Sequence, residues 1–360
     1  MPWLSDNLNI DNILSQISSK ENISDIHVST DEYISLRING EVKKMTDQPK
    51  LTEEMVEIIV KQLMCGNQKA FEKFVSDREA DFSFIWMDGT PYRVNTFFKL
   101  WKIWIVLRKI NSKAKKLEDL MFNDLAESIK QRVLSKGQGL FMVTWPTWSW
   151  KSTSLVAMIE FLNETRPDHI ITIEDPVEFI FHPKKALISQ REVWHDTWAF
   201  MNALRAAMRE DPDIVLVWEI RDKETAEAVL NLAETWHLVF STLHTSSAAG
   251  TINRFISFFP PEIQDSVADR LSEILIGVQS QRLVKKVDDQ GRVWVYEILI
   301  NTTAVKNNIK KRQLPQIDSI IETWIKQWMI SIQQYAKRLI EQWIVKEDTV
   351  SWILSQRASV

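Results

Sequence analysis

Two patterns of apolar positions divide the chain. Between residue 8 and about residue 110, short stretches in which apolar and polar residues alternate predict strands. Helical stretches near residue 10 and over 53–63 accompany them, which is typical of a small α+β domain. The strands are expected at 25–28, 34–38, 81–85, 92–98 and 103–108.

The pattern changes at about residue 118, where apolar runs alternate with helical periodicity. Such alternation predicts an α/β fold, with a parallel sheet covered by helices. Beyond about residue 300 the pattern is helical throughout. The strands are expected at 141–144, 170–173, 214–217 and 238–242, and the helices at 151–163, 199–209, 223–234, 247–255 and 262–277. The domains are expected at 1–110, 119–300 and 301–360, with a polar linker at 111–118.

One segment between a predicted strand and a predicted helix carries the clearest candidate chemistry. Its setting and its Lys-Ser ending match the Walker A phosphate loop, G-x-x-x-x-G-K-[ST]. In that loop the lysine reaches the β and γ phosphates of ATP, and the serine hydroxyl binds Mg²⁺. The candidate nucleotide site is Trp145, Pro146, Thr147, Trp148, Ser149, Trp150, Lys151, Ser152 and Thr153, with Ser152 as the metal ligand.

Tryptophan occupies the glycine positions of this loop. The backbone amides can curl around phosphate only with positive φ and close approach, which glycine tolerates and a bulky residue does not. The chain has 8 Gly and 16 Trp in 360 residues, whereas average usage predicts roughly 25 glycines. The two counts together come close to that number. We therefore hypothesise that most tryptophans are glycines encoded by UGA. The alternative is a Trp-rich protein whose loop cannot bind phosphate.

Acidic residues follow two of the predicted strands. Glu219 comes after the strand at 214–217, where it could orient or deprotonate an attacking water. Glu174, Asp175 and Glu178 follow the strand at 170–173 and could hold Mg²⁺ through water. The alternatives are a solvated strand-end acid in the first case and a charged turn closed by Pro176 in the second.

Histidines and arginines complete the candidate set. His237 and His244 flank the strand at 238–242, and one or both could sense the γ phosphate. Arg93 and Arg108 lie on adjacent predicted strands, where an arginine supplied to a neighbouring subunit could stabilise phosphoryl-transfer charge. Ordinary strand-end histidines and surface salt bridges are the alternatives.

Composition excludes several classes of protein. The net charge of −4 argues against a nucleic-acid motor. The single cysteine, Cys65, excludes an intramolecular disulfide framework and a Cys-rich zinc site. No apolar run reaches the length of about 18 residues that a membrane span needs. The N-terminus shows no signal peptide pattern, so a cytoplasmic protein is expected.

Six segments resemble the PilT family, the retraction ATPases of type IV pili within the broader type II/IV secretion ATPases. Residues 145–152 resemble the family's Gly-Pro-Thr-Gly-Ser-Gly-Lys-Ser, and 172–178 resemble its acidic box. The other segments are 24–27, 190–194, 203–219 and 233–248. The resemblance implies an N-terminal PAS-like domain, a RecA-like P-loop core and a C-terminal helical region, assembled as a homo-hexameric ring.

The same resemblance implies ATP hydrolysis with Mg²⁺. It implies that Glu219 is the catalytic acidic residue, that Glu178 belongs to the acidic box and that His244 lies on the γ-phosphate side. Arg93 and Arg108 match arginines that the N-terminal domain offers to the nucleotide. The partner would be an inner-membrane pilus platform protein at the cytoplasmic face of the membrane, with other pilus motor ATPases possible and no nucleic acid.

Residues 304–311 are similar to the retraction subgroup's Ala-Ile-Arg-Asn-Leu-Ile-Arg-Glu but depart from it at Asn308 and Lys311. A pilus-assembly or type II secretion motor, or a non-hydrolysing ring subunit if the tryptophans are real, therefore stays open. Family glycines match Trp145, Trp148, Trp150, Trp194, Trp218 and Trp236, and are expected at Trp101, Trp104, Trp324, Trp328 and Trp343; Trp3, Trp86, Trp198, Trp294 and Trp352 have no assignment.

Overall fold

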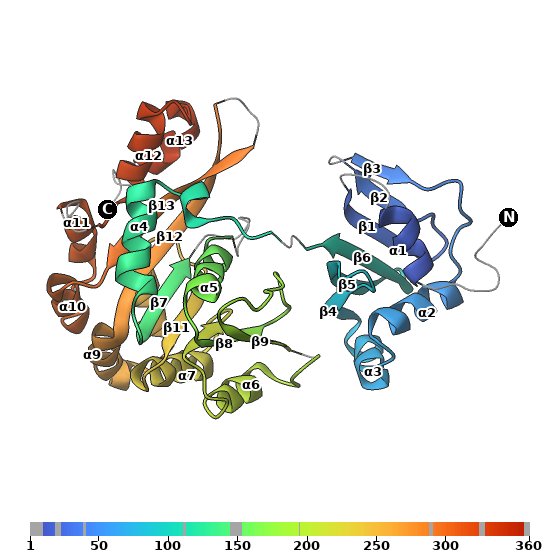
Figure 1. The fold of residues 1–360 in the computed structure, drawn as a ribbon, viewed down its shortest axis with the longest axis horizontal. Helices are drawn as coiled ribbons and strands as arrows, with labels where there is room; N and C mark the ends of the chain where they lie inside the picture. The colour runs from blue at the N-terminus through green and yellow to red at the C-terminus, as the bar shows by residue number, and fades with distance from the viewer. Residues whose placement is uncertain are drawn as a thin grey trace. The chain divides into compact units, whose positions relative to one another are not determined.

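The computed structural model describes residues 10–18, 23–38, 41–110, 113–144, 153–193, 195–287, 291–323 and 328–355. The chain divides into two compact units (Figure 1). Unit 1 comprises Met1–Lys113, Glu174–Phe181 and Arg191–Phe200, and unit 2 comprises Ala114–Ile173, His182–Gln190 and Met201–Val360. Both units combine sheets with helices, so the predicted α/β class is confirmed.

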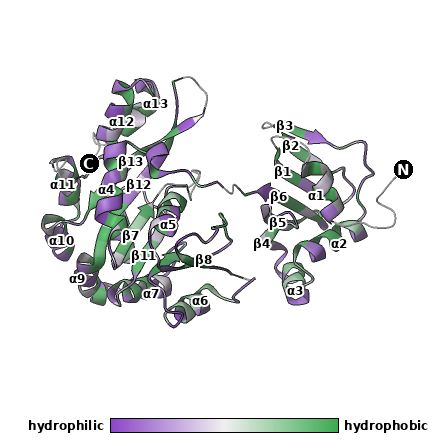
Figure 2. Ribbon diagram, viewed as in Figure 1, coloured by the Kyte–Doolittle hydropathy of each residue, from purple (hydrophilic) through white to green (hydrophobic). Residues whose placement is uncertain are grey.

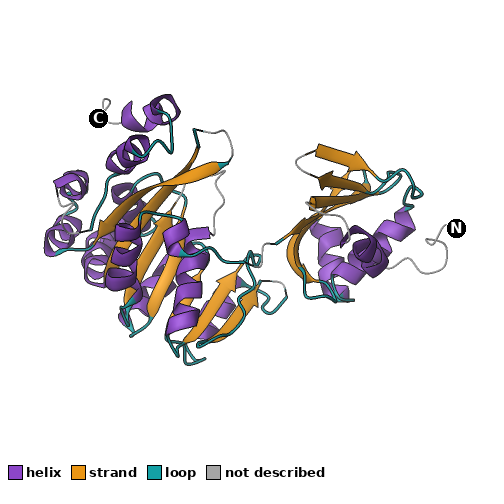
Figure 3. Ribbon diagram, turned by 45° about the horizontal axis from the view of Figure 1, so that its top comes forward, coloured by secondary structure: helices purple, strands orange, loops and turns teal. Residues whose placement is uncertain are grey.

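Unit 1 is built on a six-stranded antiparallel sheet with the order β3-β2-β1-β6-β5-β4. Helices α1 and α2 share one hydrophobic core with this sheet (Figure 3). The strands are β1 (Ile23–Ser29), β2 (Ser35–Ile38), β3 (Glu41–Lys44), β4 (Glu79–Ile85), β5 (Pro91–Lys99) and β6 (Lys102–Lys109), and the helices are α1 (Ile10–Ser18), α2 (Glu53–Leu63) and α3 (Gln68–Asp77).

The local sequence explains why these helices form. Thr52 caps α2, since its side chain accepts a hydrogen bond from the backbone N–H of Met55. The buried residues of α2 recur at helical spacing and face the core. Asn67 caps α3 in the same way, and α3 ends where Arg78 takes a left-handed conformation.

Unit 2 is built on a seven-stranded sheet with the order β13-β12-β7-β11-β10-β8-β9. The pairs from β12 through β7, β11 and β10 to β8 are parallel, and β12 pairs with β13 antiparallel. The strands are β7 (Gly139–Thr144), β8 (His169–Glu174), β9 (Leu187–Glu192), β10 (Ile214–Val217), β11 (Leu238–Leu243), β12 (Leu275–Lys285) and β13 (Arg292–Ile300).

The central strands of unit 2 are the most apolar part of the fold (Figure 2). Every residue of β7, β10 and β11 is buried, as expected for parallel strands covered on both faces. No helix in the described ranges is long and apolar enough to cross a membrane. The helices of unit 2 include α4 (Asn123–Ile129), α5 (Thr153–Thr165), α6 (Phe200–Ala207, whose first residue belongs to unit 1), α7 (Lys223–Glu234), α8 (Ala248–Ser257), α9 (Gln264–Ile274), α10 (Thr303–Lys310), α11 (Pro315–Thr323), α12 (Ile332–Glu341) and α13 (Glu347–Ser355).

The structure confirms the predicted parallel strands and the helical C-terminal part, but the helix expected at 262–277 is wrong at its end. Helix α9 stops at Ile274, and the next residues begin β12. Gly277 lies in this strand, where an added Cβ would be 2.3 Å from the carbonyl oxygen of Leu299. The close approach of β13 therefore requires glycine. The strand pair β12–β13, strands β3 and β9, and helices α3 and α4 were not predicted.

Candidate active site

Glu219 and His244 meet at the carboxyl ends of two adjacent parallel strands. Strands β10 and β11 pair in register, with Val217 opposite Ser241. His244 directly follows β11, and Trp218 separates Glu219 from the end of β10. Nε2 of His244 lies 3.1 Å from Oε1 of Glu219. The side chain of His244 is 29% exposed and that of Glu219 is 18% exposed, so both can be reached from solvent. The carboxyl edge of a parallel sheet is where ligands bind in open α/β folds.

The second carboxylate oxygen of Glu219 is also engaged. Nε of Arg221 donates to Oε2 of Glu219 over 2.8 Å. An imidazole and a guanidinium therefore fix the orientation of this carboxylate. Sequence reasoning missed Arg221, although a basic side chain two residues after a strand-end acid was a usable signal.

Hydrogen bonds from both neighbouring strands hold the backbone around Glu219. The N–H of Trp218 donates to the carbonyl of Ile173 over 3.1 Å, and the N–H of Ile220 donates to the carbonyl of Thr242 over 3.0 Å. The hydroxyl of Thr242 donates in turn to the carbonyl of Trp218. The backbone that carries Glu219 is thus held by hydrogen bonds to both β8 and β11.

In unit 1, Arg93 contacts two carboxylates. Its Nε and Nη2 donate to Asp81 over 3.2 and 2.6 Å, and its Nη1 lies 3.2 Å from Oε1 of Glu178. Burial alone would lower the pKa of Arg93, but the hydrogen bond and charge of Asp81 and the charges of Glu178 and Asp175 raise it above its ordinary value. Sequence reasoning missed Asp81, which lies one strand away on β4.

Glu192 organises the acidic turn that carries Glu178. One carboxylate oxygen of Glu192 accepts from the N–H of Val177 over 2.9 Å, and the other accepts from the N–H of Ser83 over 2.8 Å. Oε2 of Glu174 accepts from the N–H of Glu178 over 3.3 Å. The carboxylates of Glu192 and Glu174 therefore hold the backbone of the turn that carries Glu178.

Arg108 lies directly opposite Arg93 in the pairing of β5 with β6, on adjacent strands as predicted. Its Nε donates to Asp25 over 2.7 Å, and Asp25 also accepts from the hydroxyl of Ser24 over 2.8 Å. Burial would raise the pKa of Asp25, but these hydrogen bonds and the charges of Arg108 and His27 lower it. The side chain of Arg108 remains 69% exposed.

The candidate nucleotide loop itself, from Trp145 to Ser152, lies outside the described residues. Its flanks are described: β7 ends at Thr144 and α5 begins at Thr153. His237 lies at the other end of β11 from His244, and its Nδ1 is 3.0 Å from the carbonyl of Leu232. It therefore has no part in the Glu219 site. Among the described residues, no group of three or more His, Cys, Asp or Glu side chains could hold a metal ion.

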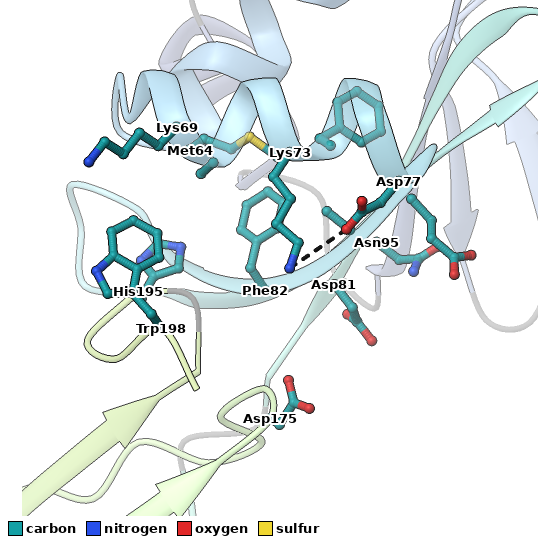
Figure 4. A pocket seen from close by; sticks show the side chains of 14 residues that line it. Met64, Lys69, Lys73, Asp77, Asp81, Phe82, Asn95, Asp175, His195 and Trp198 are labelled. Atoms are coloured by element: carbon teal, nitrogen blue, oxygen red, sulfur yellow. Dashed lines mark ion pairs between the residues drawn. The ribbon is translucent and has the colours of Figure 1, made fainter. Parts of the chain in front are cut away.

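A cavity of about 430 Å³ lies in unit 1 between α3, β4 and the loop that carries His195 and Trp198 (Figure 4). Its walls carry both signs of charge, including an ion pair of 3.6 Å between Lys73 and Asp77. Asp81 lines this cavity and also holds Arg93. Asp81, the carboxylate that holds Arg93, is therefore accessible from this cavity.

The chain matches a family model described as type II/IV secretion system protein over residues 7–340. It is 41% identical over 336 residues to the type IV pilus retractation ATPase PilT of Pseudomonas aeruginosa, covering 93% of this chain and 95% of the relative. It is 41% identical over 310 residues to the twitching motility protein of Neisseria gonorrhoeae, covering 86% and 81%.

Two solved structures have the same fold over almost the whole chain. The pilus retraction motor PilT with bound ADP matches with a TM-score of 0.86 and 36% identity, covering 98% of this chain and 99% of that chain. The ATPase DotB of Legionella pneumophila matches with a TM-score of 0.84 and 27% identity, covering 96% and 95%. The resemblance that the sequence motifs predicted is thereby confirmed, and the chain belongs to the type II/IV secretion system protein family, among its PilT-like ATPases.

Proposed function

We propose that this chain hydrolyses ATP as one subunit of a homo-hexameric ring that powers retraction of type IV pili. The observation that carries the proposal is the pairing of Glu219 with His244 at the carboxyl edge of the parallel sheet. The ring would work in the cytoplasm, at the inner face of the membrane, through an inner-membrane pilus platform protein and without nucleic acid. The names of the relatives support retraction, whereas the sheet-edge site supports hydrolysis.

The chemistry would be in-line attack of water on the γ phosphate. Glu219, held by His244 and Arg221, is suited to orient the water and accept its proton. Lys151 would bind the phosphates. Arg93 and Arg108, as arginines offered by the N-terminal domain, would stabilise the charge that develops in transfer.

Magnesium would be held by Ser152, whose hydroxyl is an oxygen ligand of the kind that Mg²⁺ prefers, together with the phosphate oxygens. The carboxylates of Glu174, Asp175 and Glu178 form no metal site by themselves, like every other acidic cluster among the described residues. When bound, the ion would neutralise charge on the phosphate oxygens.

Hydrolysis requires a phosphate loop that can close, and we infer that the loop tryptophans are glycines. Trp236, Trp343, Trp101 and Trp328 have φ of 71, 58, 69 and 70°. Left-handed backbone costs a non-glycine residue about 1–2 kcal/mol. The first three side chains are also 81–85% exposed, which is unusual for tryptophan. Glycine accounts for both properties.

Trp86 differs from these four tryptophans. Its side chain is only 7% exposed, and its Nε1–H donates to Oδ1 of Asp11 over 2.9 Å. Its indole is packed and its one polar group has a partner, as buried tryptophans require. The glycine hypothesis therefore applies to the tryptophans at turns and in the loop, and Trp86 is expected to be authentic.

The decisive experiment is tandem mass spectrometry of peptides from the protein in its source organism, followed by ATPase assays on protein of the sequence so determined. Glycine at 145, 148 and 150, with hydrolysis that depends on Mg²⁺, is the expected result. Tryptophan at these positions, with no ATP binding, would overturn the proposal and favour a non-hydrolysing ring subunit.

A further inference from the structure

Strands β12 and β13 carry a run of buried polar side chains in the sheet of unit 2. Gln279, Ser280 and Gln281 are completely buried on β12, and Tyr296 is completely buried on β13. Burying polar groups costs free energy unless they are hydrogen-bonded. No sequence motif explains these buried polar residues, so their role is inferred from their hydrogen bonds.

The contacts converge on one hydroxyl at the start of helix α5. The hydroxyl of Ser154 donates to Oε1 of Gln281 over 2.8 Å and lies 3.0 Å from the phenolic oxygen of Tyr296. Because the Ser154 proton goes to Gln281, the Tyr296 hydroxyl is the donor to Ser154. Nε2 of Gln279 also donates to Oε1 of Gln281, over 3.3 Å. We call Ser154, Gln281 and Tyr296 the α5 anchor.

The α5 anchor stands next to the candidate nucleotide loop in the sequence. Ser154 is the second residue of α5 and follows Lys151 by three positions. On the other flank of the loop, Thr144 ends β7 beside Ser280 of β12. The hydroxyl of Thr251 donates to that of Thr144 over 3.4 Å. Strands β12 and β13 thus contact the chain where α5 begins, and β12 also borders the end of β7.

We propose that Gln281 and Tyr296 are positioning residues for nucleotide binding, an inference that rests on the proposed function. They hold the first turn of α5 on the sheet and so fix the helix N-terminus whose amides would face phosphate. Positioning of this kind matters because the amides at a helix N-terminus can bind phosphate only when that end of the helix is held in place. The two residues do not touch nucleotide themselves.

Tyr335 provides a matched control, which separates a positioning role of the Tyr296 hydroxyl from a purely structural one. Tyr335 is 1% exposed, and its ring packs on that of Tyr296 with centroids 5.4 Å apart. Its hydroxyl is hydrogen-bonded to the backbone at Phe122. Tyr335→Phe therefore removes a buried hydroxyl from the same aromatic cluster but keeps the ring that packs on Tyr296.

The test compares Tyr296→Phe, Ser154→Ala and Tyr335→Phe in the full-length protein as its source organism makes it. Tyr296→Phe is expected to raise the Kd for ADP and the KM for ATP by about threefold to tenfold, as expected for one lost buried hydrogen bond. The change in kcat should be smaller. Ser154→Ala should have the larger effect, since it removes both hydrogen bonds of the α5 anchor. Tyr335→Phe should leave the nucleotide affinity unchanged.

Hydrogen exchange in the nucleotide-free protein provides the second measurement. Amides in the first turn of α5 should exchange faster in Tyr296→Phe than in Tyr335→Phe. Equal exchange and equal ADP affinity in these two variants would overturn this inference alone, and so would faster exchange with unaltered affinity. An unmodified protein that does not bind ADP would overturn the proposed function, and this inference with it.

Discussion

Two strand-end carboxylates, one in each unit, are equally buried but differently partnered. The side chains of Glu219 in unit 2 and Glu178 in unit 1 are both 18% exposed. Glu219 lies against the imidazole of His244, whereas Glu178 lies against the guanidinium of Arg93. An imidazole can exchange protons near neutral pH, and a guanidinium cannot. The partner, rather than the burial, distinguishes a carboxylate suited to proton transfer from one suited to balancing charge.

The largest expected effect comes from Glu219→Gln. It should lower kcat for ATP hydrolysis by about 10²–10⁴-fold, the range for loss of a general base. The Kd for ATP should change little, because glutamine keeps the size and can still accept a hydrogen bond. Single-turnover hydrolysis together with equilibrium binding measures both quantities.

Glu178→Gln is the matched comparison for that variant. It should lower kcat by only about tenfold, since Glu178 is expected to contribute charge and orientation without accepting the proton. If both variants lose activity to the same extent, the assignment of different roles to the two carboxylates is wrong.

An effect similar to that of Glu178→Gln is expected for Arg93→Lys. Lysine keeps the positive charge but cannot reproduce the two-pronged contact with Asp81 or reach Glu178 at the same time. Hydrolysis measured as kcat/KM should fall by about tenfold. Arg37→Lys is the control, because Arg37 lies 3.6 Å from Asp25 on another strand of the same sheet. An equal loss in the control would point to general damage to the sheet.

The coupling between Arg93 and Glu178 can be measured apart from activity. A double-mutant cycle with Arg93→Gln and Glu178→Gln should give a coupling free energy of about 0.2–1 kcal/mol, as for other partly exposed ion pairs. The measurement is urea unfolding of the four proteins. A coupling well above this range would make the pair a main structural contact of unit 1.

The smallest effect concerns Asp25, whose folded pKa lies below the ordinary value of 3.8 because the hydrogen bonds of Arg108 and Ser24 outweigh burial. A depressed folded pKa contributes stability that is present above the unfolded pKa and is lost as pH falls through the folded pKa. Unfolding free energies should therefore decline below about pH 4. Asp25→Asn should show a shallower decline, and an identical decline would exclude Asp25 as its source.

The sequence by itself determined the features that local patterns encode. Continuous apolar runs marked the buried parallel strands β7, β10 and β11, because strands covered on both faces need no polar residues. Glu219 and His244 were candidate site residues because each comes after the end of one of these strands. The Lys-Ser ending of residues 145–152 and the family segments identified the class of ATPase.

Only the tertiary structure decided which side chains meet. Asp81 reaches Arg93 across a strand pair, Glu178 is 85 positions from Arg93, and Tyr296 is 142 positions from Ser154. Local periodicity carries no information on such pairs, because sheet order and register bring them together. The same physical reason explains why Leu275 begins a strand rather than extending α9: pairing with β7 and β13 outweighs the helical pattern.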